Sequence, residues 1–358
     1  MRPDNDISQD LQARVIDAIT QQHRLFIHGG NSKAFYGNPV ECEHSLDVSA
    51  HSGIISYEPS ELVLTARAGT PITIIEQILA SQRQMLAFEP PVYHADSTLG
   101  GVVAAGLAGP RRMYGGSIRD SVLGIKMING HGKIVQFGGQ VIKNVAGYDV
   151  SRLMAGSMGS LGVILEISLK VMPMPAKDIT LTLETTNHKA IGLFNQWRPT
   201  PLPISASCYY DDCLYIRLSG GTQSVMHFRH QIAGDLLADA QGFWTAIRNQ
   251  THEFFYASKK PLWRLSLPPS TPIISRLEEK SMIEWNGAQR WLYSNIPQHI
   301  IRGIASKHHG HATLFKGHLP GVSRFTPLES GLRQLHHNLK KAMDPHHIFA
   351  AGRLYRDF

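Results

Sequence analysis

Apolar residues along the first eighty positions recur with the spacing of helices and strands. Residues 7–22 carry apolar side chains every three or four positions, which predicts an amphipathic helix. The tetrad LFIH follows as a strand, and Val63 to Ala68 form a second apolar run of strand length. Thr70 is then expected to cap a helix that has Pro71 at its first position. The pattern is therefore one of alternating helices and strands.

Between residues 97 and 172 the pattern changes to strands joined by small residues. The segment 97–109 is rich in Gly and Ala. Leu123 to Ile128 and Lys133 to Phe137 lie on either side of an Asn-Gly pair, which is a β-hairpin signal. Tyr148 to Met154 fits a short helix. Val163 to Met172 alternates apolar and polar residues, which predicts a half-buried strand.

The second part of the chain begins at the Pro-rich segment MPMPAKD, residues 172–178, where we place a domain boundary. Strands are expected at Ala206 to Tyr210 and Leu214 to Leu218, and helices over about 222–238 and 270–280. This mixture predicts a small α+β domain.

A last helix is expected from about Leu328 to Met343, ending at Asp344-Pro345. Its apolar residues recur at helical spacing. They are Leu328, Leu332, Leu335, Leu339 and Ala342.

The composition is that of an ordinary globular protein. The 358 residues are enough for two domains, and 42% of them are hydrophobic. The formal net charge is +7, and 19 histidines make the charge sensitive to pH. The basic residues are scattered and form no stripe interleaved with aromatic residues, which argues against nucleic-acid binding.

Signals for secretion, membrane insertion or cysteine chemistry do not occur in the sequence. The polar, acidic start MRPDNDISQDLQ does not fit a signal peptide, and no window approaches 18 consecutive apolar residues. Cys42, Cys208 and Cys213 form no C-x-x-C pair and no group of four. We therefore expect no disulfide framework, no zinc knuckle and no internal iron–sulfur site.

The segment FIHGGNSK, residues 26–33, has the features of an anion-binding turn. Two glycines directly after a strand permit a positive φ and let the backbone approach a ligand. Successive amides in such a turn form a concave site for oxyanions, and Asn31, Ser32 and Lys33 add side-chain donors. The segment fits neither the G-x-G-x-x-G pattern nor a P-loop. Taken alone, it favours a strand-to-helix turn without a ligand.

Glycines recur in several separate loops between residues 97 and 162. Several such loops in one domain suggest a backbone surface that wraps a long, flat, phosphate-bearing ligand, because a side chain at these positions would block its approach. These glycines are Gly100, Gly101, Gly106, Gly109, Gly115, Gly116, Gly147, Gly156, Gly159 and Gly162.

The order of the motifs resembles the FAD-binding domain of the vanillyl-alcohol-oxidase (PCMH) family. The family pattern is roughly T-x-G-G, a small-residue loop, Y-G-x-x-R-D, a strand pair, a Lys, G-Y-D and G-S-x-G-x-L-G. Here it spans about residues 20–175, in DSTLGG, MYGGSIRD and KNVAGYDVSRLMAGSMGSLG. The segments EPPVYHADSTLGG, PLWRLSLP, GHATLF and DPHHIFAAGRLY extend the resemblance over the whole chain, to the smaller FAD-binding subunits of bacterial glycolate oxidase.

The resemblance implies an α+β fold in three parts. These are a PCMH-type FAD-binding domain of two α/β subdomains (residues 1–175), a smaller α+β cap-like substrate domain (176–325), and a C-terminal helix and tail (326–358) that pack back on the FAD domain. The family usually closes with an Asn-Pro-Gly-Lys-like turn, of which only Gly352 and the cation Arg353 are present.

The resemblance also implies how the chain holds its cofactor, FAD. His28 to Lys33 and Ser97 to Gly101 would hold the pyrophosphate, and Ala104, Ala105 and Leu107 would form an apolar bed for the ring. No Arg-Ser-Gly-Gly-His pattern is present, so we expect a non-covalent flavin. The predicted cofactor-binding residues are His28, Gly29, Gly30, Asn31, Ser32, Lys33, Pro91, Ser97, Thr98, Leu99, Gly100, Gly101, Gly106, Gly109, Arg119, Asp120, Gly159, Gly162, Val163 and Ile164.

The chemistry implied by the family is oxidation of a 2-hydroxy acid, which needs a base for the hydroxyl proton and a cation for the carboxylate. Catalytic relatives carry a metal-linked H-x-G-D-G-N-x-H motif, whereas this chain has only HHGHATLF. We therefore expect no metal site and leave the catalytic residues unassigned. The candidates are Arg264, Arg290, His308, His309, His311 and Lys316.

The function expected from the resemblance is that of the FAD-binding subunit of a glycolate oxidase (glycolate dehydrogenase) complex, beside a larger FAD-binding subunit and an iron–sulfur subunit. The few cysteines agree, because electrons leaving this flavin would need clusters of a partner. The alternatives are a non-catalytic, flavin-loaded assembly or electron-relay subunit and a freestanding D-lactate-type FAD dehydrogenase. We expect a cytoplasmic location, with peripheral contact to the inner membrane face only through partners.

Overall fold

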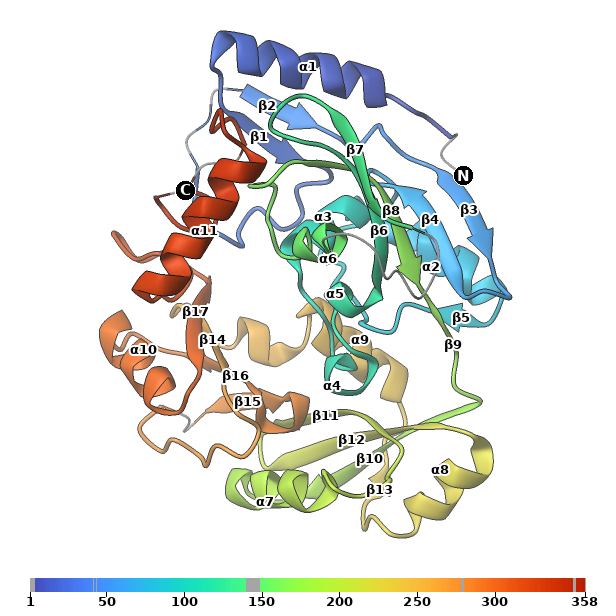
Figure 1. Ribbon diagram of the computed structural model, residues 1–358. Helices are drawn as coiled ribbons and strands as arrows, with labels where there is room; N and C mark the ends of the chain where they lie inside the picture. The colour runs from blue at the N-terminus through green and yellow to red at the C-terminus, as the bar shows by residue number, and fades with distance from the viewer. Residues whose placement is uncertain are drawn as a thin grey trace. The chain divides into compact units, whose positions relative to one another are not determined.

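The computed structural model describes residues 4–40, 42, 44–139, 149–277, 280–349 and 352–357. It divides the chain into two units (Figure 1). The first unit comprises residues 1–107, 117–173 and 327–358, and the second comprises 108–116 and 174–326. The short segment 108–116, which the sequence analysis places in the first domain, therefore belongs with the second unit.

The described residues of the first unit form three sheets. β1 (Leu25–His28) pairs in parallel with β2 (His44–Asp47), and β5 (Gln84–Met85) pairs with β9 (Met172–Pro173). The largest sheet is antiparallel, with the strand order β3-β4-β8-β6-β7. Its strands are β3 (Ile54–Glu58), β4 (Val63–Arg67), β6 (Val122–Ile128), β7 (Ile134–Gly138) and β8 (Val163–Lys170). The helices are α1 (Ser8–Gln21), α2 (Ile72–Ser81), α3 (Leu99–Ala105), α5 (Ile118–Ser121), α6 (Val150–Leu153) and α11 (Ser330–Met343).

The LFIH strand, the hairpin of β6 and β7 and the first helix are confirmed, because each depends on a local pattern. Figure 1 shows α1 lying across β1 and β2. Leu11 and Val15 of α1 are fully buried in the core that these elements share. Ile16, another apolar residue of the predicted helix, is 48% exposed. It lies beside the turn at Gly132, where an added Cβ would be 2.7 Å from its Cγ1.

Two local predictions for the first unit are wrong because tertiary contacts override them. The Thr70 hydroxyl does not cap α2 but bonds with the backbone of Gly53, and α2 begins at Ile72 after Pro71. β8 is buried on both faces rather than on one, since Ile164 and Ser168 are also buried. The cause is that β8 lies between β4 and β6 while α3 packs against it.

The second unit is built on one sheet of eight antiparallel strands, in the order β13-β10-β12-β11-β15-β16-β14-β17. Its strands are β10 (Lys177–Glu184), β11 (Ile204–Tyr210), β12 (Cys213–Gly220), β13 (Asp235–Leu236), β14 (Leu262–Ser266), β15 (Ser281–Glu284), β16 (Gln289–Tyr293) and β17 (His311–Lys316). Its helices are α4 (Arg112–Gly115), α7 (Asn187–Trp197), α8 (Thr222–Arg229), α9 (Ala240–Asn249), α10 (Gln298–Lys307) and the 3₁₀ turns η1 (Glu253–Tyr256) and η2 (Trp285–Gly287).

Of the two helices predicted for this unit, one is shorter than expected and the other is not formed in the residues that the structure describes. The helix predicted over 222–238 ends at Arg229, because the chain then turns to form the edge strand β13 against β10. Gly234 permits this approach, since a Cβ there would lie 2.8 Å from the carbonyl oxygen of Thr182. Residues 270–277 and 280 form loop and turns rather than a helix, and the carbonyls of Thr271 and Pro272 accept hydrogen bonds from Arg290.

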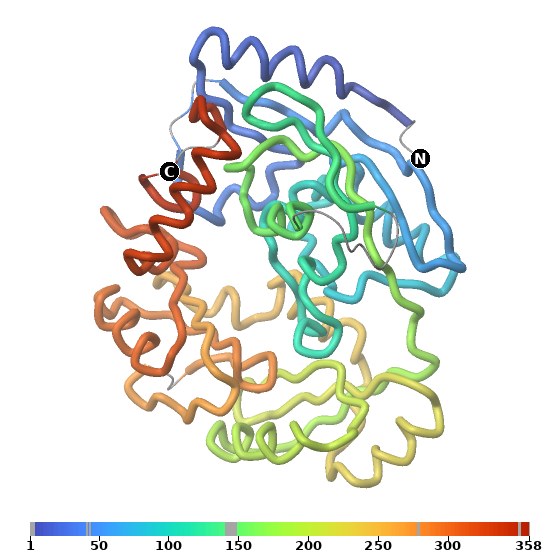
Figure 2. Tube along the Cα trace, in the orientation of Figure 1, coloured from blue at the N-terminus to red at the C-terminus, as the bar shows by residue number. Residues whose placement is uncertain are grey.

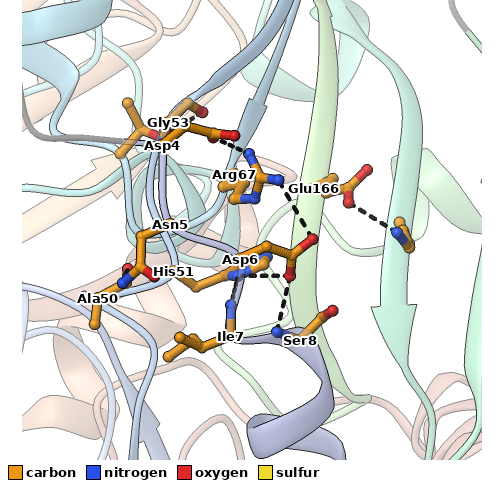
Figure 3. Close-up of polar contacts among 12 residues, drawn as sticks. Asp4, Asn5, Asp6, Ile7, Ser8, Ala50, His51, Gly53, Arg67 and Glu166 are labelled. Carbon is orange, nitrogen blue, oxygen red and sulfur yellow. Dashed lines mark hydrogen bonds and ion pairs between the residues drawn. The ribbon is translucent and has the colours of Figure 1, made fainter.

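The N-terminal residues are fastened to the first unit by a polar cluster (Figure 3). Asp4 and Asp6 both pair with the buried guanidinium of Arg67 on β4. The distance between Nη2 of Arg67 and Oδ2 of Asp6 is 3.3 Å. Nδ1 of the fully buried His51 accepts a hydrogen bond from the Ile7 amide at 3.2 Å. Burial lowers the pKa of His51, so that its ring is neutral and can accept this bond at neutral pH.

The C-terminal helix is anchored to the same unit through a buried lysine. The Nζ atom of Lys340 donates at 2.7 Å to the carbonyls of Ser160 and Phe349 and to the carboxylate of Asp344. The Leu25 amide then donates to the carbonyl of Ile348, so the tail runs beside β1, as Figure 2 shows. The tail then passes the segment that follows β1, where the Asn38 amide donates to the carbonyl of Arg353 at 2.9 Å.

Candidate functional site

A cavity opens in the first unit where β1 ends. It has about 790 Å³ of free space, part of it open to solvent. Its walls come from the segment after β1, from α3, from the 158–164 loop and from the C-terminal tail. The lining residues are Phe26 to Ala34, Tyr36, Val48, Ala68, Thr98, Gly100, Gly101, Ala104, Ala105, Met158, Gly159, Gly162, Ile164 and Arg353.

The glycines of the 26–33 segment are required for close packing. A Cβ at Gly30 would lie 1.7 Å from the carbonyl oxygen of Asp96, and one at Gly29 would lie 2.4 Å from the Thr98 hydroxyl. The expected positive φ falls not on these glycines but on Asn31, at 50°. Asn tolerates this left-handed conformation better than most residues, so the turn is made one position later than expected.

Backbone amides gather in this turn together with a hydroxyl and an ammonium group. Within the part of the chain that the structure describes, the amides of Gly30, Asn31 and Ser32 donate to no protein group. The Ser32 hydroxyl bonds to that of Ser97 at 2.8 Å, and the Lys33 ammonium lies 5.7 Å from the centre of the Tyr93 ring. Amides and a cation at one turn suit an anionic group such as a diphosphate.

Arg353 closes the cavity from the C-terminal side. Its guanidinium donates to the carbonyls of Asn38 at 2.9 Å and Ala34 at 2.8 Å, and it lies over the Phe26 ring at 5.7 Å. Only 8% of the residue is exposed. Arg353 therefore holds the backbone of the 33–38 loop in place while one side of it lines the cavity.

The structure brings together more than half of the residues that the sequence nominates for the cofactor. Those that line the cavity are His28, Gly29, Gly30, Asn31, Ser32, Lys33, Thr98, Gly100, Gly101, Gly159, Gly162 and Ile164. The other nominated residues, which lie outside this lining, are Pro91, Ser97, Leu99, Gly106, Gly109, Arg119, Asp120 and Val163.

Several of the outlying residues have another role. Leu99 and Val163 are buried in the core, and Gly106 ends α3 with a φ of 66°. Asp120 closes the capping box of α5 with Ser117, and the carbonyl of Gly109 accepts a bond from Trp285 within the second unit. The family motif around Gly147 lies outside the described residues.

Sequence reasoning missed part of the wall. The missed residues are Phe26, Ile27, Ala34, Tyr36, Val48, Ala68, Met158 and Arg353. Most are apolar or small residues without a motif, and they reach the cavity only through the pairing of strands. Arg353 had one signal, the Gly-Arg pair near the end of the chain.

The candidates for substrate chemistry lie on the sheet of the second unit. Arg264 on β14 and His311 on β17 belong to register pairs that are two positions apart. Arg264 pairs with Thr313 and Ser266 pairs with His311, with the pair of Leu265 and Ala312 between them. Desolvation, together with the Arg264 charge, lowers the pKa of His311. His311 is therefore largely neutral at pH 7 and able to accept a proton.

Other candidates are explained by structure. Arg290 is fully buried and donates to the carbonyls of Gly287 at 3.1 Å and Pro272 at 2.9 Å, so its guanidinium is part of the core. His308 and His309 form the turn after α10, where His309 has a φ of 56°. Within the described ranges, no group of three or more His, Cys, Asp or Glu side chains is arranged to hold a metal ion.

A buried carboxyl lies on the same sheet. Glu284 is 3% exposed, and its Oε2 accepts hydrogen bonds from the Trp291 indole at 2.6 Å and the Gln289 amide at 3.0 Å. Burial raises the pKa of Glu284 to about 7, which these donors and the Arg264 charge only partly offset. Nothing in the sequence marked this residue.

Comparison with known proteins identifies the family. A family model described as "FAD binding domain" matches residues 7–138. The glycolate oxidase subunit GlcE of Escherichia coli (strain K12) is 47% identical over 352 residues, which cover 98% of both chains. The chain belongs to the GlcE family of glycolate oxidase subunits. The expected family and its PCMH-type FAD-binding fold are thereby confirmed.

More distant relatives of this GlcE-family chain match over part of their length. The glycolate oxidase subunit GlcD of Bacillus subtilis (strain 168) is 35% identical over 125 residues, which are 27% of that chain. A D-lactate dehydrogenase of Anaerostipes hadrus is 33% identical over 28% of its length. A solved alkyldihydroxyacetonephosphate synthase has a TM-score of 0.68 at 16% identity, covering 97% of this chain and 74% of that one, and so shares the fold.

The cavity of this GlcE-family chain fits its cofactor, FAD. A flat ring system with a diphosphate needs an apolar bed and an anion site, and the cavity joins Ala104 and Ala105 to the turn at Gly30–Lys33. Glycines let the backbone form this wall, since side chains at Gly29 or Gly30 would not fit. Separately, no described helix is long and apolar enough to cross a membrane.

Proposed function

We propose that this chain is the FAD-binding subunit of a glycolate oxidase complex that oxidises glycolate or a related 2-hydroxy acid to the 2-oxo acid. The observation that carries the proposal is the 47% identity to the Escherichia coli glycolate oxidase subunit GlcE over 98% of both chains. The donor-rich, glycine-lined cavity of the first unit supports it, because the reaction needs a bound flavin.

In this proposal the turn at residues 29–33 and the loop held by Arg353 bind the diphosphate of FAD non-covalently. When bound there, FAD would supply the acceptor for the hydride that leaves Cα of the substrate, and the hydroxyl proton would pass to a base of the protein. Arg264 holds the substrate carboxylate, since a guanidinium matches two carboxylate oxygens. His311 takes the hydroxyl proton, because its lowered pKa leaves the ring neutral at pH 7.

The partners in this proposal are a larger FAD-binding subunit and an iron–sulfur subunit, and any contact with the membrane face is through them. The chain has three cysteines, Cys42, Cys208 and Cys213, too few to ligate a four-cysteine cluster. In this proposal, electrons from its flavin leave through groups of another subunit.

One observation favours a second candidate, a flavin-loaded assembly or electron-relay subunit. HHGHATLF lacks the acidic residue, the Asn and the second spaced His of the catalytic relatives. A freestanding D-lactate-type dehydrogenase is less well supported, since the D-lactate dehydrogenase of Anaerostipes hadrus matches over only 28% of its length.

A visible spectrum of the purified chain, followed by glycolate without oxygen, separates the candidates. Bleaching of the flavin in the isolated chain supports catalysis by this subunit. A flavin that stays oxidised in the isolated chain, while the assembled complex turns over glycolate, supports the relay role.

A pair of glycine variants tests the cofactor site in the assembled complex. Gly30→Val should abolish flavin binding by this subunit, because a Cβ there would lie 1.7 Å from the carbonyl oxygen of Asp96. Gly139→Ala, in the same unit, should keep the flavin, since a Cβ there meets nothing within 4 Å. Full flavin content in the Gly30→Val subunit would place the cofactor elsewhere.

A further inference from the structure

A second cavity lies within the second unit. It has about 680 Å³ of free space, part of it open to solvent. Its walls come from α4, from the end of α7 and the residues after it, and from the turn η2. It shares no lining residue with the cavity of the first unit. Its free volume is in the range of sites for small molecules, about 300–1,000 Å³.

The walls of this second cavity are mainly apolar. Met113 of α4, Trp197 at the end of α7, Leu202 and Pro269 all line it. Each of the four is half-buried, so part of its surface stays open to a ligand. An indole ring and a thioether adapt well to a flat apolar group. The walls therefore favour a ligand with a flat, apolar body.

A network of three side chains fixes a hydroxyl group in this cavity. Nδ2 of Asn286, a residue that is 7% exposed, donates to the hydroxyl oxygen of Tyr114, and Oδ1 accepts from the Ser207 hydroxyl at 2.7 Å. Because the Tyr114 oxygen already accepts a bond, its own hydrogen is directed elsewhere. Among the described residues, none accepts that hydrogen. Tyr114 is 43% exposed, so a ligand can reach it.

The turn that carries Asn286 has an unusual backbone. Trp285 and Asn286 have φ angles of 53° and 52°, and the left-handed region is rare for a residue as bulky as Trp. The Trp285 indole donates to the carbonyl of Gly109 at 3.1 Å, and its ring lies 5.0 Å from the guanidinium carbon of Arg112. These contacts hold the turn against the 108–116 segment. Backbone strain that is held in this way clusters at binding sites.

Arg198 brings a positive charge to the same cavity. The residue is exposed, and its Nη2 donates at 2.7 Å to the side-chain oxygen of Asn195, which is a neutral partner. Within the described part of the chain, no carboxylate pairs with Arg198. Burial raises the pKa of Tyr114 and the Arg198 charge opposes this rise, so the guanidinium acts on the same hydroxyl. A hydroxyl hydrogen beside a guanidinium suits a carboxylate.

We propose that this cavity binds a small carboxylate with a flat, apolar body. The carboxylate accepts hydrogen bonds from the Tyr114 hydroxyl and the Arg198 guanidinium, and the apolar body lies against Met113 and Trp197. Glycolate lacks such a body and would satisfy only the polar groups. The inference does not depend on the flavin reaction, because every residue that it uses belongs to the second unit.

Calorimetric titration of the full-length chain with phenylacetate and with its neutral counterpart phenylacetamide tests the proposal. Phenylacetate should bind with a Kd of about 1 mM or tighter. It should bind at least about tenfold more tightly than the amide, because hydrogen bonds to a charged group are the stronger ones. An equal concentration of glycolate should not displace it. No binding of phenylacetate, or equal affinity for acid and amide, would overturn the proposal.

Variants assign the binding to this cavity. Tyr114→Phe should weaken phenylacetate binding by about tenfold, and Arg198→Gln should remove the preference for acid over amide. The matched controls Tyr256→Phe and Arg276→Gln, at exposed positions of the same unit outside the cavity lining, should keep the wild-type affinity.

Thermal unfolding of each variant without ligand should match the wild type, which separates lost binding from a lost fold. If Tyr114→Phe unfolds early, the exposed Arg198→Gln decides the test. Undiminished binding in both cavity variants, or competition by glycolate, places the acid at another site and refutes the proposal.

Discussion

The buried carboxyl of Glu284 should make the second unit less stable as the pH rises. Its pKa is raised from 4.5 to about 7 in the folded chain, so between these values the folded state binds a proton that the unfolded state has released. Stability is then fully present below pH 4.5 and is lost as the pH rises through about 7. At about 1.4 kcal/mol for each pH unit, the loss amounts to about 3 kcal/mol.

Glu284→Gln isolates this contribution. The Gln side chain is uncharged and nearly the same size, and its oxygen can still accept from the Trp291 indole and the Gln289 amide. The variant should therefore lack the loss between pH 4.5 and 7 and should be more stable than wild type above pH 7, by up to about 3 kcal/mol. Glu184→Gln, at an exposed carboxylate of the same unit, serves as the control.

Urea unfolding followed by tryptophan fluorescence measures the free energy of unfolding of the second unit, in which Glu284 lies. All five tryptophans of the chain lie between residues 197 and 291, so the signal reports on the second unit. Unfolding curves at pH 5, 6, 7 and 8 should diverge steadily between wild type and Glu284→Gln. Parallel pH dependences of the two proteins would refute the reasoning, since Glu284 would then titrate alike in both states.

Other predictions concern the cofactor, the tail and the base. Arg353→Ala should weaken flavin binding by about tenfold or more, because the charge-assisted hydrogen bonds to the 33–38 loop are lost, and Arg353→Lys should restore part of it. Flavin fluorescence on dilution measures the affinity, and an unchanged affinity would contradict the prediction. Lys340→Met should destabilise the first unit by about 3–5 kcal/mol, since the buried Asp344 carboxylate loses the cation that pairs with it. The temperature at which the protein releases its flavin measures this loss, and an unchanged release temperature would contradict the prediction. His311→Gln should lower kcat on glycolate on the order of a hundredfold. It should also remove the loss of activity in acid, which sets in below the ordinary histidine range because the pKa of His311 is lowered. A pH profile of kcat measures this, and a variant that keeps the acid loss would exclude His311 as the base.

Local sequence determined the elements whose signals lie within a few residues. The LFIH strand and the hairpin of β6 and β7 were placed correctly, because alternation and an Asn-Gly turn act over short range. The helix predicted over 270–280 failed for the converse reason. There the backbone carbonyls accept hydrogen bonds from Arg290, a residue of β16. The local spacing of apolar residues contains no information about such a distant donor.

The cofactor site was only partly readable from the sequence. The turn at Gly30–Lys33 carries a motif, and the motif order placed the glycines of residues 97–162 in the same domain. The structure added Arg353, which is more than 300 positions from the loop that it holds. This contact forms only because the C-terminal tail folds back beside β1. Neither the composition of the chain nor the spacing of its motifs predicts that path.

The sequence by itself determined that α11 is amphipathic, since its leucines recur at three and four residues. Only the tertiary structure decided which face is used inside the chain. Lys340 fixes which face of α11 points into the first unit, because its buried ammonium donates three hydrogen bonds there. Periodicity shows that a stripe exists, but what the stripe packs against depends on groups distant in sequence, and here those groups leave the leucines exposed.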